Sequence, residues 1–365
     1  MTYELALPRA VPAFHDFSAT VLEQMRRDLI IYVMIAVYVI GVVGLCLMTD
    51  NWAQATFYPY FRRWPKMFLI TMPLIALGFD AMRVIIRVDE HRRLAFSRVY
   101  TAERFGRLAA GMALLMALMM FQGAFTTMKN MLPALQGGFS YDVTHANIDE
   151  ALHFGYAPWA LLHGALGDGF MRTLIDWNYN VLWFGLCFGG LFYVATVKRC
   201  APFRLRYMLM FMVAWVVVGN VLAGTFLSAG PAFYAQVTGD SQRFTPLVAS
   251  LGGDVPTVAA RYQTLLWRVY QEGRAGFASG ISAFPSVHVS LITINALFLA
   301  ERLPKLRLLA AAYVAIIIMS SVYLGWHYAI DGYVAVLVVV SIHLALKKWF
   351  AGRAGSEAQR QENLS

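Results

Sequence analysis

The sequence has little charge and little cysteine, and each shortage excludes a class of protein. Charged residues make up 14% of the 365 positions, whereas about a quarter of the residues in a soluble domain are charged. Apolar residues make up 59%. The three cysteines (Cys46, Cys187 and Cys200) lie within or beside apolar runs and are too few for a disulfide framework. The composition predicts a chain that resides in lipid.

The sequence also lacks the short motifs of several enzyme classes. It contains no nucleotide-binding glycine loop, no H-E-x-x-H zinc motif and no G-x-S-x-G nucleophile motif. The net charge of +9 does not indicate a nucleic-acid partner, because the basic residues lie in short loops between apolar runs. We therefore expect no cofactor and no nucleic acid, and membrane lipids as the partners.

Several apolar runs reach the length of about 20 residues that a helix needs to cross a bilayer. They predict an all-α fold, a polytopic membrane helical bundle of about eight spans with interfacial helices on its outer face. Arg26 and Arg27 precede the first run, but that run is long and no small-residue cleavage site follows it, so we expect an uncleaved span. The expected spans are residues 29–49, 67–82, 108–126, 181–197, 207–227, 286–302, 305–324 and 329–347.

The basic residues predict the orientation of these spans. An even number of crossings puts both termini on one side, and that side holds 21 of the 30 Lys and Arg residues. Because short cytoplasmic loops are rich in Lys and Arg, we expect both termini in the cytoplasm, at the cell inner membrane if the protein is bacterial. We expect a three-span region over residues 1–126, a second domain over 127–348 and a disordered cytoplasmic tail over 349–365.

Two outer segments, residues 127–180 and 228–285, are too long for simple turns. Four aromatic residues of the first suit the headgroup level of the membrane: Tyr156, Trp159, Trp177 and Tyr179. In the second, Thr257 is expected to cap a helix that runs to Gln271. Its apolar stripe would consist of Val258, Tyr262, Leu265, Leu266 and Val269. Arg261 and Arg268 would share another face, which is either a solvated basic face or a grip for phosphate.

Two histidines stand at the starts of expected spans. His288 ends the segment Gly280-Ile-Ser-Ala-Phe-Pro-Ser-Val-His288, and His327 lies in Gly325-Trp-His-Tyr-Ala-Ile-Asp331. Two crossings separate them, so both are expected at the outer face and can share one site. Ionisable residues so close to hydrocarbon are costly and are therefore functional candidates.

Each segment offers a distinct chemistry. Pro285 suits the first turn of a helix, whose free N–H groups attract an anion, and Ser286 adds a hydroxyl donor. A protonated His288 can give a proton to a departing alcohol. His327 and Asp331 are four residues apart, so the carboxylate can keep one ring nitrogen protonated and leave the other as a nucleophile.

Other interpretations use the same residues. A single histidine at a span end is more often a headgroup-level residue, and a Pro-Ser pair is a common helix cap; their joint occurrence on one side favours a site. A metal could bind two histidines and an aspartate, but the Pro-Ser helix start favours an anion over a cation. A transporter or channel would show charges near mid-span, and a non-catalytic membrane protein would be expected to lose one of the three ionisable residues.

The segment Ser282-Ala-Phe-Pro-Ser-Val-His288, followed by His327-Tyr-Ala-Ile-Asp331, resembles the type 2 phosphatidic acid phosphatase superfamily. It is most similar to the inositol phosphorylceramide synthase branch, whose members transfer a phospho-head group. There the motif reads F-P-S-x-H, and Ser321 stands where phosphatases have an arginine. The resemblance extends over about residues 140 to 345 and includes Gly230-Pro-Ala-Phe-Tyr234 and the stretch 147–155 with Pro158-Trp159.

The resemblance implies a metal-independent lipid phosphatase or phosphotransferase domain over 127–348. In it His327 attacks phosphorus to form a phosphohistidine, Asp331 orients His327, and His288 protonates the leaving alcohol and then activates the acceptor. The acceptor would be water or another alcohol. The first phosphatase motif, a lysine followed six residues on by Arg-Pro, is absent. The expected phosphate ligands are therefore Ser286 and the outer arginines Arg243, Arg261, Arg268 and Arg274.

Overall fold

The computed structural model describes residues 10–167, 169–253 and 255–362. All regular elements in these residues are helical, which confirms the predicted all-α class. Seven helical runs in them are long and apolar enough to cross a membrane, so the chain is an integral membrane protein. The first three runs are α2 (Leu29–Thr49), the run Trp52–Arg87, which contains α3 (Phe57–Pro65) and α4 (Met72–Arg87), and α6 (Ala102–Gln136). The next two are Phe170–Thr196, which contains α9 (Phe170–Trp177) and α10 (Trp183–Thr196), and Lys198–Thr225, which contains α11 (Ala201–Val216) and α12 (Ala223–Thr225). The last two are Pro304–Tyr323, which contains α17 (Arg307–Tyr323), and Ala329–Gly352, which lies within α18 (Ala329–Glu362).

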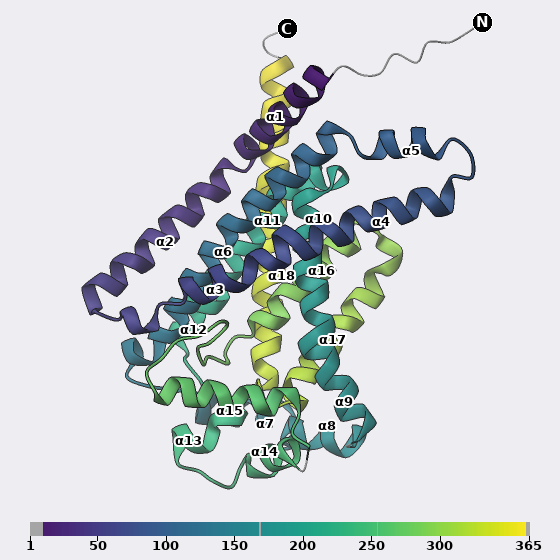
Figure 1. Ribbon diagram of the computed structural model, residues 1–365. Coiled ribbons are helices and arrows are strands. Elements are labelled where there is room, and N and C mark those ends of the chain that lie inside the picture. The colour runs from purple at the N-terminus through teal and green to yellow at the C-terminus, as the bar shows by residue number, and fades with distance from the viewer. Residues whose placement is uncertain (1–9, 168, 254, 363–365) are drawn as a thin grey trace, which may run out of the picture. The chain divides into compact units, whose positions relative to one another are not determined.

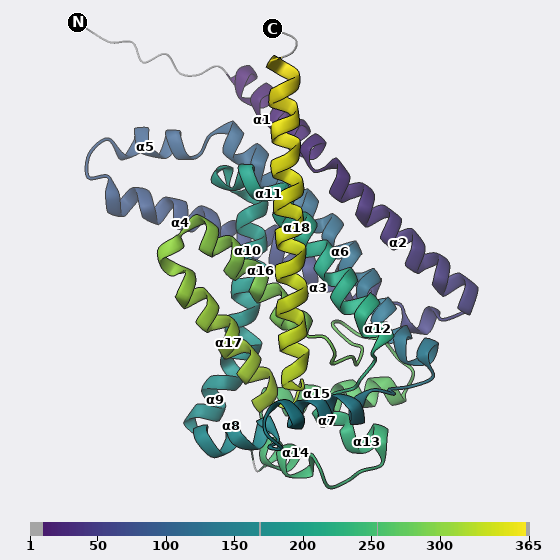
Figure 2. The same ribbon diagram turned by 180° about the vertical axis from the view of Figure 1, so that it is seen from behind.

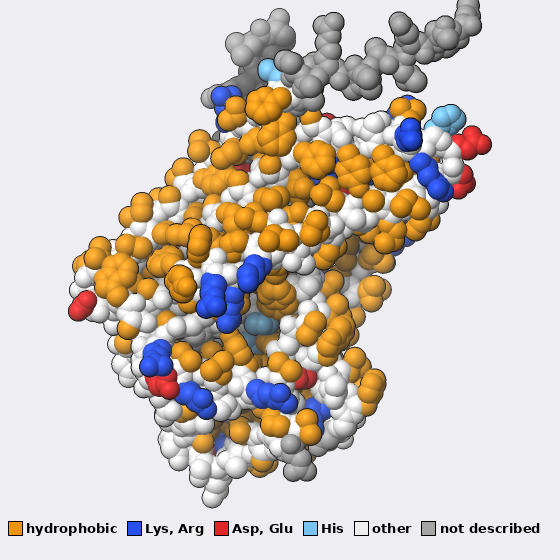
Figure 3. Space-filling model, viewed as in Figure 1, with side chains coloured by type: hydrophobic (Ala, Val, Ile, Leu, Met, Phe, Trp, Pro, Cys, Tyr) orange, Lys and Arg blue, Asp and Glu red, His pale blue; other side chains and the backbone are white. Residues whose placement is uncertain are grey.

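The seven runs coincide with seven of the eight expected spans. The remaining one, residues 286–302, is α16 (Val287–Arg302), a helix of 16 residues. Hydrophobic side chains cover much of the face seen in Figure 3. On α2, for example, Val37 is 66% exposed and Ile40 is 70% exposed. Such outward apolar faces are stable only against lipid.

The chain divides into two compact units. The first comprises the chain up to residue 41 with residues 57–123 and 191–205, and the second comprises residues 42–56, 124–190 and the chain from residue 206. Each unit is therefore built from segments distant in the sequence, with 42–56 in the second unit and 191–205 in the first. Within the first unit, a buried ion pair between Asp28 and Arg204 joins the start of α2 to the segment 191–205.

In the second unit, α16 packs against α17 and α18 (Figures 1 and 2). Short helices gather at the end of the unit where α18 begins: α7 (Asp142–Leu152), α8 (Pro158–Leu166), α13 (Tyr234–Thr238), α14 (Thr245–Gly252) and α15 (Val258–Gln271). In the first unit, α1 (Ala10–Arg27) leads into α2, and α5 (Arg92–Val99) packs against α4.

Buried carboxylates hold the starts of two helices in the second unit. Asp149 of α7 accepts hydrogen bonds from the backbone amides of Ala329 and Ile330, both at 2.9 Å, at the start of α18. Asp176 of α9 accepts from the first two amides of α15, at 2.7 and 3.1 Å. The first amides of a helix have no partner within the helix, and a carboxylate also complements the positive end of the helix dipole. These contacts fix where α15 and α18 begin.

The predicted cap of α15 is confirmed, but its predicted buried face is wrong in part. The Thr257 hydroxyl accepts a hydrogen bond from the first turn of the helix at 3.0 Å. Val258 and Leu265, expected in the apolar stripe, are exposed. Gln263 is buried instead, because its side-chain amide donates to the backbone carbonyl of Leu324 at 2.9 Å. A tertiary hydrogen bond, rather than the apolar periodicity, sets the rotation of this helix.

The expected tail, residues 349–365, begins near the end of the last membrane run. The last helix, α18, continues to Glu362, so residues 349–362 are helical, while residues 363–365 lie outside the described part of the chain. The stretch is rich in Ala, Glu, Gln and Arg, which have high helix propensity and can extend a helix that is already nucleated.

We expect Asp149→Ala to lower the free energy of unfolding by about 3 kcal/mol, because two buried amides lose a charged acceptor. Thermal unfolding of the purified protein in detergent measures the change. The control is Asp240→Ala, since Asp240 accepts a backbone hydrogen bond in an exposed turn. Equal shifts in Tm for the two variants would contradict a special role of Asp149.

Candidate active site

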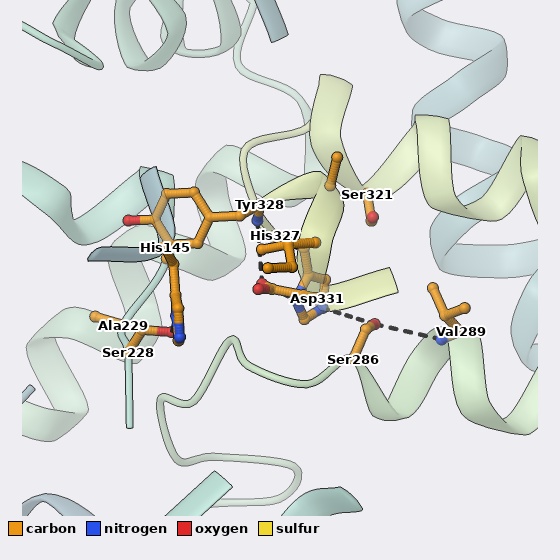
Figure 4. Close-up of polar contacts among 12 residues, drawn as sticks. His145, Ser228, Ala229, Ser286, Val289, Ser321, His327, Tyr328 and Asp331 are labelled. Carbon is orange, nitrogen blue, oxygen red and sulfur yellow. Dashed lines mark hydrogen bonds and ion pairs between the residues drawn. The ribbon is translucent and has the colours of Figure 1, made fainter. Parts of the chain in front are cut away.

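His327 lies in the turn between α17 and α18, and both of its ring nitrogens have a polar partner (Figure 4). Nδ1 lies 3.1 Å from Asp331 Oδ2, and Nε2 lies 3.1 Å from Ser286 Oγ. The same Asp331 oxygen accepts from the backbone amide of Tyr328 at 3.1 Å. His327 is 7% exposed and Asp331 is fully buried. The imidazole is therefore fixed in position, with Nδ1 on the carboxylate side.

Ser286 connects this turn to the start of α16. Its hydroxyl caps the helix by accepting from the amide of Val289 at 3.3 Å, and its own amide donates to the backbone carbonyl of Asp331 at 3.1 Å. Pro285 was expected in the first turn of the helix, but it precedes the cap and α16 begins at Val287. The first backbone amides of α16 still lie beside Ser286, as the sequence predicts.

His288 is clamped between two aromatic rings. The ring centroids of Tyr179 and Trp183 lie 4.9 and 3.9 Å from that of His288, nearly parallel to it. The Trp183 indole also donates to the backbone carbonyl of His288 at 3.0 Å. Tyr179 is thus 2% exposed and packs against His288, so its side chain is covered by protein rather than open to lipid and water as expected.

Both histidines line one cavity of about 150 Å³ in the second unit. One part of its lining is polar and includes Lys129, Asn180, Ser282, His288 and His327. Another part is apolar and aromatic and includes Ala229, Phe233, Tyr262, Leu266, Ile281 and Trp326. A histidine side chain is visible within a hollow of the face shown in Figure 3. The shape and chemistry of the cavity suit a ligand with a polar head and an apolar body.

Lys129 was not among the predicted site residues. It lies on α6, beyond residue 126 where we expected the third span to end. Within the described residues it is the one Lys or Arg that lines the cavity. Gly280, at a φ of +92°, lets the opposite loop approach, since a Cβ there would lie 3.0 Å from Lys129 Cγ. The sequence signal that could have indicated Lys129 is that it is a single lysine close to the end of a long apolar run.

The structure does not bring the four expected arginines to the cavity lining. Arg243 forms an ion pair with Glu150 at 2.8 Å, and Arg274 pairs with Glu272 at 3.2 Å. The other two, Arg261 and Arg268, are exposed on α15. By contrast, His327, Asp331 and Ser286 contact one another, and His288 shares the cavity with His327.

Asp142 ties the cavity wall to the turn that carries the histidine. Its two carboxylate oxygens accept from the amides of Ala229 and Gly230, at 2.7 and 2.8 Å. The Tyr328 hydroxyl, next to His327 in the chain, donates to the same carboxylate at 2.8 Å. Gly230 is required here, because a Cβ would lie 2.7 Å from the backbone carbonyl of Trp326. Such contacts make the cavity wall and the turn one rigid assembly.

Burial lowers the pKa of two histidines that lie outside the membrane-spanning runs, His145 and His327. His145 of α7 packs on the ring of Phe284 at 4.3 Å, with Nδ1 3.1 Å from Ser228 Oγ, and burial lowers its pKa to about 4. Burial, with Lys129 nearby, also lowers the pKa of His327. When Nδ1 of the neutral His327 donates to Asp331, Nε2 carries no proton and its lone pair can accept from the Ser286 hydroxyl.

The chain matches the PAP2 superfamily over residues 145–345, which is more than half of its length and includes His288, His327 and Asp331. It belongs to the PAP2 superfamily. That membership supports a phosphatase or phosphotransferase activity on membrane lipids. Comparisons with curated proteins and with solved structures returned no match. Superfamily membership, expected from the sequence, is confirmed, while the inositol phosphorylceramide synthase branch stays a prediction. Among the described residues, no group of three or more His, Cys, Asp or Glu is placed to hold a metal ion.

The buried His145 predicts how stability depends on pH. Its pKa of about 4 lies below the unfolded value of about 6.5, so its contribution is present above that value and is lost as the pH falls towards the folded pKa. One such group lowers the free energy of unfolding by about 2 kcal/mol as the pH falls from about 6.5 to about 5. We expect Tm to fall over this range, and to fall less in His145→Gln. His15→Gln, at an exposed position, is the control; identical pH profiles for His145→Gln and the wild type would refute the assignment.

Proposed function

We propose that this chain is a metal-independent membrane enzyme that cleaves a lipid phosphoester through a phosphohistidine and passes the phosphoryl group or phospho-head group to an alcohol or to water. The observation that carries the proposal is the cavity shared by two histidines, in which Asp331 and Ser286 hold His327 at its two ring nitrogens. A carboxylate that fixes the tautomer of an imidazole is a common way to activate it.

In the first step, Nε2 of His327 attacks phosphorus while Asp331 retains the proton on Nδ1. The Nε2–P bond forms, the P–O bond to the lipid alcohol breaks, and His288 gives a proton to the departing oxygen. In the second step, His288 takes the proton of the acceptor hydroxyl. The acceptor O–P bond then forms as the Nε2–P bond breaks, which restores both histidines.

Ser286 and Lys129 complete the proposed phosphate site. In the resting structure, the Ser286 hydroxyl occupies the Nε2 lone pair of His327. A phosphoryl group that takes this place frees the hydroxyl to donate to a phosphoryl oxygen. The first amides of α16 and the ammonium of Lys129 supply the remaining positive potential. We therefore assign to Lys129 the role that the sequence assigned to the outer arginines.

The branch and the orientation are further parts of the proposal. Ser321, at the position of the phosphatase arginine, is buried, and its backbone carbonyl accepts from the amide of Trp326 at 3.0 Å. It supports the turn but brings no charge. Val287 stands where most phosphatases of the superfamily have a glycine, and together with Ser321 it favours an inositolphosphotransferase-like enzyme. The excess of Lys and Arg in the expected cytoplasmic loops favours cytoplasmic termini and a cavity near the outer face.

We expect His327→Ala to lower turnover of a lipid phosphate by at least about 10⁴-fold. Brief incubation of the wild type with ³²P-labelled lipid should place acid-labile label on His327. Asp331→Asn should reduce kcat by roughly 10²-fold to 10⁴-fold with an unchanged Tm, since its role is orientation. His15→Ala serves as the control. Label on another residue, or full turnover in His327→Ala, would end the phosphohistidine proposal.

The role of Lys129 is tested against that of the arginines. We expect Lys129→Met to lower kcat/KM by roughly 10²-fold to 10³-fold, because the phosphoryl oxygens lose their nearest cation. Lys129→Arg should recover part of the loss. The same assay on Arg261→Gln and Arg268→Gln should give activities within about twofold of the wild type. Larger losses in these two variants than in Lys129→Met would show that the arginines of α15, and not Lys129, bind the phosphate.

A further inference from the structure

A cleft in the first unit has no part in the proposed reaction. It encloses about 540 Å³ between the end of α4 and the short helix α5. Three arginines line it, two from α4 and one from α5: Arg83, Arg87 and Arg98. Apolar side chains form the rest of its walls, among them Val84 and Leu94. A concave surface that combines cations with apolar walls suits an amphiphilic anion.

The cleft begins where the lipid-facing part of α4 ends. The run Trp52–Arg87 is long and apolar enough to cross a membrane, and most of it is not buried by protein. Phe79 is 62% exposed and Ile86 is 70% exposed, so the apolar surface of α4 continues to its last turn. The helix then ends at Arg87. Such a junction between an apolar surface and arginine side chains marks the level of lipid headgroups.

The charge of the cleft is positive. Two carboxylates line the cleft, Asp80 and Glu90. Asp80 is paired with Arg104 at 3.0 Å, so Glu90 is the lining carboxylate that remains to offset the three arginines. The segment 83–98 carries five arginines and two acidic residues. Within the described part of the chain, the arginines that line the cleft form no hydrogen bond or ion pair with other side chains. Their guanidinium groups are exposed and available to a ligand.

We propose that this cleft binds the headgroup of an anionic phospholipid. Guanidinium groups donate paired hydrogen bonds to phosphate oxygens. The glycerol backbone and the first acyl carbons would pack on Val84 and Leu94, in continuity with the lipid-facing surface of α4. A free phosphate ion would leave those apolar walls in water, so the lipid is favoured over the ion. The site is separate from the catalytic cavity, because all lining residues of the cleft belong to the first unit and all those of the cavity to the second.

The test titrates the purified full-length chain in detergent with dioleoyl phosphatidylglycerol or dioleoyl phosphatidylcholine and counts bound lipid by native mass spectrometry. We expect phosphatidylglycerol to bind more tightly than phosphatidylcholine. Arg87→Gln and Arg98→Gln should each weaken phosphatidylglycerol binding by roughly fivefold. Arg93→Gln, on the same short helix but outside the cleft lining, should leave it unchanged. Each variant is first shown to retain the Tm of the wild type.

Several outcomes would overturn the proposal. Equal affinities for phosphatidylglycerol and phosphatidylcholine would show that the negative charge of the headgroup does not contribute to binding. Equal losses in Arg93→Gln and Arg98→Gln would show a diffuse basic surface rather than a cleft. Full displacement of the lipid by the same concentration of inorganic phosphate would make it a site for the free ion. Because lipid binding is measured without turnover, failure here leaves the proposed reaction at His327 untouched, and the reverse also holds.

Discussion

The candidate site depends on a few buried carboxylates that hold the turn before α18. A buried imidazole takes its direction from hydrogen bonds to neighbouring groups. Asp331 supplies that bond to His327, and Asp149 binds the two backbone amides at the start of α18. Asp142 adds a bond from Tyr328. Loss of one of these bonds would leave buried polar atoms without a partner, so each of them stabilises the observed turn.

Sequence patterns predicted the spans and the core of the candidate site because both are local. A run of apolar residues specifies a membrane helix without reference to the rest of the chain, and the spacing of His327 and Asp331 places them one helical turn apart. Lys129 and Tyr179 escaped prediction because their role depends on contacts with residues more than 100 positions away. The rotation of α15 was mispredicted for the same reason: a buried glutamine bound to a distant carbonyl outweighs apolar periodicity.

The cation that we propose for the phosphate differs from those expected from the sequence. Four arginines lie in the outer segments near the motifs, and each was a reasonable partner for an anion. Arg243 is already paired with Glu150, and Arg261 and Arg268 are exposed on α15 and absent from the cavity lining. A single lysine from a distant span reaches the cavity instead. In the proposed site, one cation and a helix start would hold phosphate less firmly than a cluster of arginines, which would leave more of the electrostatic stabilisation for the transition state.

The setting of His288 constrains the order of the proposed reaction. Its ring is held between Tyr179 and Trp183, and its backbone carbonyl is bound by the Trp183 indole, so the imidazole has little freedom to turn. One fixed group must then serve both the departing alcohol and the incoming acceptor. Both oxygens have to occupy the same place beside it, so the first alcohol must leave before the acceptor enters. The geometry therefore favours a ping-pong order, in which the phosphohistidine persists after the first product has left the cavity. Whether water or a lipid hydroxyl completes the cycle then depends on which of them enters the vacated, partly aromatic cavity first.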